Sequence, residues 1–133
     1  MNTDELIAID FHTHAEVSSC QGHDHFCDEF DWAADKYFGS DRRPTISETV
    51  AYYRERKIGL VMFTVDAETQ IGRRRIPNEE IAEAAYANKD MMIAFASIDP
   101  HKGLMGAREA RNAIRGRATP YQFQSDAAGR CRD

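Results

Sequence analysis

The chain has 133 residues, a formal net charge of −5, a hydrophobic fraction of 42% and a charged fraction of 29%. That length indicates one domain, and that composition is typical of a globular protein and excludes collagen, a coiled coil and a disordered tail. The negative charge argues against a general nucleic-acid binder, which usually carries a basic face.

Two further features of the sequence bear on its compartment. The longest unbroken apolar run is residues 91–96, far below the ~20 residues of a membrane helix, so we expect no membrane contact. The N-terminus is polar and acidic and lacks the basic and apolar regions of a signal peptide. We therefore expect a cytoplasmic protein whose three cysteines, Cys20, Cys27 and Cys131, are free thiols.

The first half of the chain contains one predicted strand and one predicted helix. The apolar run over residues 6–11 predicts a buried strand. Residues 15–43 follow with no sustained period and predict a long irregular loop. Thr45-Ile46-Ser47-Glu48 matches a capping box, which opens a helix that we expect Gly59 to end.

The second half continues the alternation of strands and helices. Residues 60–65 form a nearly continuous apolar run, which is typical of a parallel strand covered on both faces. A loop over 71–76 leads to a helix over 79–88, a third strand over 91–98 and a third helix over 104–114. This order predicts an α/β fold with a parallel sheet and right-handed crossovers.

The last residues, 116–133, show neither the strand period nor the helix period. The pattern calls for a fourth strand after the third helix, and none follows. Two hypotheses explain this: foreign sequence from a frameshift or an artificial chain end, or a native disordered C-terminus. We therefore divide the chain into residues 1–115 and an irregular tail over 116–133.

The sharpest chemical feature is Asp10-Phe11-His12-Thr13-His14, which closes the first predicted strand. Side chains two apart on a strand point to the same face, so His12 and His14 can aim at one point beyond the strand's carboxyl end. Two imidazoles make half of a tetrahedral zinc site, and α/β proteins place active sites at that edge. Packed or solvated histidines are the alternative reading of the pair.

This segment resembles the first-strand metal motif of the amidohydrolase superfamily. More narrowly, it is similar to the amidohydrolase-related branch that includes aminocarboxymuconate-semialdehyde decarboxylase and resorcylate decarboxylases. Over about residues 6–115, the long loop after the first strand also fits, as do Pro44-Thr45, Asn78-Glu79-Glu80-Ile81 and Ser97-Ile98-Asp99-Pro100. The resemblance implies three βα units of an incomplete (β/α)₈ barrel of the TIM type, which needs ~250 residues when complete.

The resemblance also implies an activity. It implies a divalent metal, usually Zn²⁺, held by His12 and His14. The reaction would be metal-dependent hydrolysis or decarboxylation of a small anionic or acyl-thioester substrate, in aromatic-compound catabolism. The family's other ligands, histidines from middle strands and an aspartate after the last strand, have no counterpart, since His101 comes too early in the pattern.

Two alternative functions remain beside that reading. One is a catalytically inactive fragment that folds or forms a homo-oligomer through exposed barrel edges. The other, ranked lower, is a PHP-type phosphoesterase. Proteins of that type carry Thr-Asp-His after the second strand, where this chain has Thr64-Val65-Asp66.

Other residues are candidates for substrate or metal binding. Arg73 and Arg74 lie near the end of the second predicted strand and could hold a carboxylate or CoA phosphates, or form a solvated loop with ion pairs. Asp66 is a candidate partner of a ligand histidine or a turn residue. Trp32 is a candidate pocket wall or a packed aromatic. Cys20, His23, His25 and Cys27 could bind zinc, although their spacing matches no common structural site.

Overall fold

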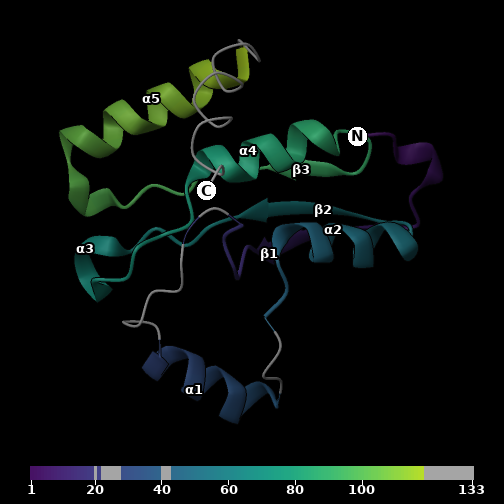
Figure 1. Cartoon of the computed structure of the whole chain (residues 1–133). Coiled ribbons are helices and arrows are strands. Elements are labelled where there is room, and N and C mark those ends of the chain that lie inside the picture. Colours follow the sequence, from purple (N-terminus) through teal and green to yellow (C-terminus); the bar gives the residue numbers. More distant parts are fainter. Residues whose placement is uncertain (20, 22–27, 40–42, 119–133) are drawn as a thin grey trace.

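The computed structural model describes residues 1–19, 21, 28–39 and 43–118. Three strands form one parallel sheet in the order β1-β2-β3 (Figure 1). Their bounds are Ala8–His14 for β1, Ile58–Phe63 for β2 and Met92–Ala94 for β3. The predicted α/β fold with a parallel sheet is confirmed, and the sheet is open.

Five helices accompany the strands in the described residues: α1 (Asp28–Phe38), α2 (Ile46–Glu55), α3 (Glu68–Ile71), α4 (Asn78–Ala87) and α5 (Leu104–Ala118). Short 3₁₀ turns cover Thr3–Glu5 and Pro100–Lys102. Within those residues, every helix is too short or too polar to cross a membrane.

The connections between strands place α2 and α4 on the same face of the sheet. α2 joins β1 to β2, and α4 joins β2 to β3 (Figure 1). The two helices contact each other, and they pack on β2 and β3. This follows from strand order, because crossovers of one hand between successive neighbours return over the same face.

The core lies between these two helices and the sheet. Leu60 and Met62 of β2 alternate toward the helices, where Ile81 of α4 meets them. All three side chains are fully buried, and each contributes about 1.5–3 kcal/mol. The remaining core members are Ile46, Val50, Ile76, Met91, Met92 and Ala94.

The predicted start of α2 is confirmed, whereas its predicted end is wrong. Glu48 N donates to Thr45 Oγ1 over 3.3 Å, and Thr45 N donates to Glu48 Oε2 over 2.9 Å. Lys57, with φ of 54°, provides the left-handed residue after the helix, and Gly59 lies inside β2. A Cβ at Gly59 would come within 2.8 Å of Leu6 Cδ1, the end of a flexible side chain that would have to move.

The region predicted as an irregular loop over 15–43 contains helix α1. Arg43 contacts this helix, since its Nη1 lies 2.7 Å from Asp31 Oδ1 and its Nη2 donates to the Asp31 carbonyl over 3.0 Å. Trp32 and Tyr37 are 66% and 80% exposed. The sequence does carry a signal for this helix, because Phe30, Ala34 and Phe38 recur at a spacing of four residues, which is typical of an amphipathic helix.

The other element boundaries shift by a few residues. β2 covers 58–63 where 60–65 was predicted. Helix α5 continues through residue 118, so the predicted boundary of an irregular tail at 116 is three residues early. The rest of that tail, 119–133, lies outside the described residues.

The third strand is shorter than the predicted 91–98. Past its end, the side chain of Asn78 takes the place of a neighbouring strand as the hydrogen-bond partner of the backbone. Past β3, Ser97 N donates to Asn78 Oδ1 over 2.9 Å. Asn78 Nδ2 donates to the Ser97 carbonyl over 2.9 Å as well. The buried amide at the start of α4 thus pairs with both backbone groups of one residue.

We expect Asn78→Ala to destabilise the fold by about 1–3 kcal/mol, because it leaves the Ser97 N–H without its partner, whereas the Ser97 carbonyl still accepts from Arg75 Nη1 over 3.3 Å. Urea unfolding followed by circular dichroism measures this. Asn112→Ala, on the exposed side of α5, is the matched control and should change stability by less than about 0.5 kcal/mol. Equal effects of the two variants would contradict the role of Asn78.

Candidate metal centre

His12 and His14 lie side by side at the carboxyl end of β1. Their ring centroids are 4.8 Å apart, with 46° between the ring planes. Phe63 at the end of β2 presents its ring to both, at centroid distances of 5.2 Å to His12 and 4.7 Å to His14. His12 is exposed and His14 is half-buried, so the pair is open to solvent on one side.

An irregularity in β1 lies next to this pair. Asp10 pairs with Leu60, and Thr13 pairs with Met62. Between these two pairs β1 advances by three residues and β2 by two, so β1 contains one extra residue. Such a bulge re-aims side chains and strengthens the local twist of the strand. It falls at the residues where β1 turns its histidines toward Phe63.

Asp10 fixes this bulge to α2. Asp10 Oδ1 accepts a hydrogen bond from His12 N over 2.9 Å, and Asp10 Oδ2 accepts one from the Tyr53 hydroxyl over 2.6 Å. The Tyr53 hydroxyl lowers the pKa of Asp10, and the His12 N–H lowers it further. Burial and the hydrogen bond to Asp10 raise the pKa of Tyr53. Both hydrogen bonds thereby favour the charged form of the Asp10 carboxylate, next to the backbone of His12.

The two histidines fit half of a zinc site. Neutral imidazole is a preferred zinc ligand, and zinc in proteins usually takes four ligands, or three and a water. No group of three or more His, Cys, Asp or Glu side chains suited to a metal ion occurs in the part of the chain that the structure describes. Among the described residues, the donor set at this edge is therefore one pair of imidazoles.

The other predicted site residues lie in different surroundings. Arg73 is half-buried and Arg74 is exposed, in the segment between α3 and α4, and their predicted role in substrate binding stays a prediction. Trp32 is exposed on α1, with Lys36 Nζ 5.1 Å from its ring centroid. The group Cys20, His23, His25 and Cys27 lies outside the described residues, as does Cys131.

Asp66 has a role that sequence reasoning did not identify. Its side chain is fully buried, and it accepts hydrogen bonds from Arg75 Nη1 over 2.7 Å and from Lys102 Nζ over 2.8 Å. Asp99 N donates to the same carboxylate over 2.9 Å. Burial works to raise the pKa of Asp66, but Lys102, the Asp99 N–H and the charge of Arg75 together lower it. The Asp66 carboxylate thus pairs with Arg75 and Lys102, and no hydrogen bond between it and a histidine occurs in the described residues.

A second buried carboxylate, Asp99, ties the segment after β3 to α3. It accepts hydrogen bonds from the Thr69 hydroxyl, from Thr69 N over 3.0 Å and from His101 N over 2.9 Å. The Thr69 hydroxyl is the main reason that the pKa of Asp99 falls to about 2, although burial opposes it. The sequence signal was Asp99-Pro100, which we interpreted only as the end of a strand.

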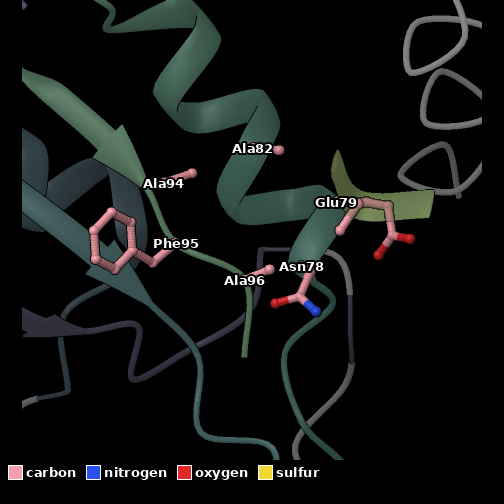
Figure 2. A pocket seen from close by; sticks show the side chains of 7 residues that line it. Asn78, Glu79, Ala82, Ala94, Phe95 and Ala96 are labelled. Atoms are coloured by element: carbon pink, nitrogen blue, oxygen red, sulfur yellow. The ribbon is translucent and has the colours of Figure 1, made fainter. Parts of the chain in front are cut away.

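Two hollows lie away from the histidines. A cavity of about 20 Å³ between α4, α5 and the end of β3 holds no more than one water. Figure 2 shows Ala94 pointing toward α4 beside it, whereas Phe95 points away from the helix. An open hollow of about 600 Å³ lies at the amino-terminal edge of the sheet, between the first residues, Arg54 and Asp90. Neither hollow is lined by His12 or His14.

No protein-family model, curated protein or solved structure matches the chain.

We expect acid to destabilise the protein through Asp99. Its pKa of about 2 in the folded protein lies below its ordinary value of 3.8. The contribution of Asp99 to the free energy of unfolding is therefore fully present above about pH 4 and is lost as the pH falls toward 2. Urea unfolding at several pH values between 2 and 5 measures this loss. In Asp99→Asn the pH dependence over this window should be shallower, and an unchanged slope would contradict the assignment.

Proposed function

We propose that the chain carries part of the active centre of an amidohydrolase-type enzyme, a metal-dependent hydrolase or decarboxylase. His12 and His14 are two ligands of a divalent ion, Zn²⁺ in the first instance. The observation that carries the proposal is the adjacent pair of imidazoles at the carboxyl end of the first strand of a parallel sheet. That edge is where enzymes with parallel sheets assemble their active sites.

The arrangement of helices supports the finer fold assignment. Three neighbouring parallel strands in sequence order, with both connecting helices on one face, are what three successive units of a (β/α)₈ barrel would contribute. A doubly wound sheet would instead place helices on both faces. We therefore propose that residues 1–115 form three βα units of such a barrel.

Each residue near the pair has a role in this proposal. A bound divalent ion would lower the pKa of a water to ~7 and polarise a carbonyl oxygen. Asp10 holds the backbone of His12 through its N–H, and Tyr53 anchors Asp10 to α2. Phe63 limits how far both imidazole rings can turn. Arg73 and Arg74 would bind the carboxylate or the phosphates of a small anionic or acyl-thioester substrate.

A catalytically inactive fragment is the second candidate. It is favoured by one observation, namely that the described residues offer two metal ligands where a catalytic zinc site uses three. Such a fragment would bind zinc weakly and show no turnover.

We expect His12→Ala and His14→Ala each to lower zinc affinity at least about 100-fold, because losing even a hydrogen-bond partner of a ligand costs about 10–100-fold. Isothermal titration with Zn²⁺ measures the affinity. His101→Ala is the matched control, since this exposed histidine lies in the turn Pro100–Lys102, and its affinity should equal the parent's.

Turnover is measured on the same variants, as thiol release from a panel of acyl-CoA thioesters and CO₂ release from hydroxybenzoic acids. The enzyme reading expects zinc-dependent turnover that both histidine variants lose and His101→Ala keeps. Zinc binding without turnover would favour the inactive fragment. Unchanged zinc affinity in both histidine variants would refute the metal centre.

A further inference from the structure

The segment that follows β2 is held against the fold without being buried in it. We call residues 67–74 the strap. It contains α3 and lies beyond the carboxyl end of β2 (Figure 1). None of its residues is buried, and Ile71, its largest apolar side chain, is 43% exposed. Apolar burial therefore contributes little to holding the strap in place.

The two residues that flank the strap are paired with each other. Asp66 Oδ2 and Arg75 Nη1 lie 2.7 Å apart, and the Asp66 side chain is fully buried. Arg75 also contacts Glu109 of α5 through its other terminal nitrogen. A surface loop whose ends meet in this way can move without carrying its flanking elements along. The Asp66–Arg75 pair therefore forms a fixed base for the strap.

The backbone of the strap gives it little stability of its own. α3 has four residues, and isolated helices shorter than about 12 residues are marginal in water. The helix ends at Gly72, which has a φ of 66°, and a Cβ at this position would meet no atom within 4 Å. The surroundings of Gly72 therefore do not prevent a change of its backbone angles.

Polar contacts hold the strap to the residues after β3. Thr69 N donates to Asp99 Oδ2 over 3.0 Å, and the Thr69 hydroxyl donates to the same oxygen. Lys102 Nζ lies 2.7 Å from Glu68 Oε2, and Arg75 N donates to Glu68 Oε1 over 3.0 Å. We call these contacts the latch. When the latch opens, Lys102 keeps its contact with Asp66 at 2.8 Å, so the buried carboxylate stays paired.

We propose that the strap opens as a unit about its base while the rest of the chain stays folded, and that the latch sets how often it opens. Segments with few buried apolar contacts are the ones that open locally in folded proteins. Arg73 and Arg74 lie on the strap, so each opening moves both guanidinium groups. That the latch thereby controls substrate binding rests on the proposed function, whereas the opening itself involves neither metal nor substrate.

Hydrogen exchange of the full chain without added metal, followed by NMR, tests the opening. The Gly72 amide reports on the strap, since it donates to the Glu68 carbonyl inside α3, and the Leu60 amide reports on the core. Gly72 should exchange more slowly than in an unstructured peptide but at least about tenfold faster than Leu60. Equal rates for the two amides would overturn independent opening, and an unprotected Gly72 amide would overturn the latch.

Variants on the strap test the latch itself. Glu68→Ala and Thr69→Val each remove part of the latch and should speed exchange of Gly72 at least about fivefold, with Leu60 unchanged. Gln70→Ala is the matched control, because this exposed side chain of the same helix makes none of the latch contacts, and its rates should equal the parent's.

Two outcomes would contradict the latch: a Gly72 rate that both variants leave unchanged, or an equal acceleration of Leu60. These rates are measured without zinc and without turnover. Failure of the strap proposal would therefore leave the metal centre standing, and failure of zinc binding or of turnover would leave the strap proposal standing.

Discussion

Both strand connections cross the same face of the sheet, and the rest of the molecule is arranged around that constraint. α2 and α4 bury one side of β2 and β3, and on the opposite side Ile93 and Phe95 are exposed whereas Val61 is buried. The carboxyl ends of all three strands lie at one edge because the strands are parallel. The histidine pair lies at this edge, where His12 is exposed and His14 is half-buried, so the pair is accessible to a metal ion.

Much of the fold could be predicted from local signals. Hydrophobic runs identified the three strands, and the capping box located the start of α2, because both signals depend on residues close in sequence. Helix α1 was missed although Phe30, Ala34 and Phe38 recur at helical spacing, because the polar residues around it led us to interpret the whole of 15–43 as one loop. Gly59 was wrongly predicted to end α2, because Lys57, a residue type that rarely takes the left-handed conformation, takes it there instead.

The candidate site shows the same division. Alternation along a strand was enough to predict that His12 and His14 share a face, since the two are separated by one residue. The link from Asp10 to Tyr53 spans 43 positions, and the contact of Asp66 with Lys102 spans 36. Such pairs cannot be read from one sequence, because nothing local distinguishes Asp66 or Arg75 from residues of a solvated loop.

The pairing of Asn78 with Ser97 has a consequence for how the layers are aligned. Two hydrogen bonds join the first residue of α4 to the backbone just past β3. The helix therefore cannot slide along the sheet by a turn, or rotate about its axis, without losing both bonds at once. A single side-chain amide therefore fixes the position of α4 along the sheet. That position is set at the first residue of the helix and does not depend on the length of the helix.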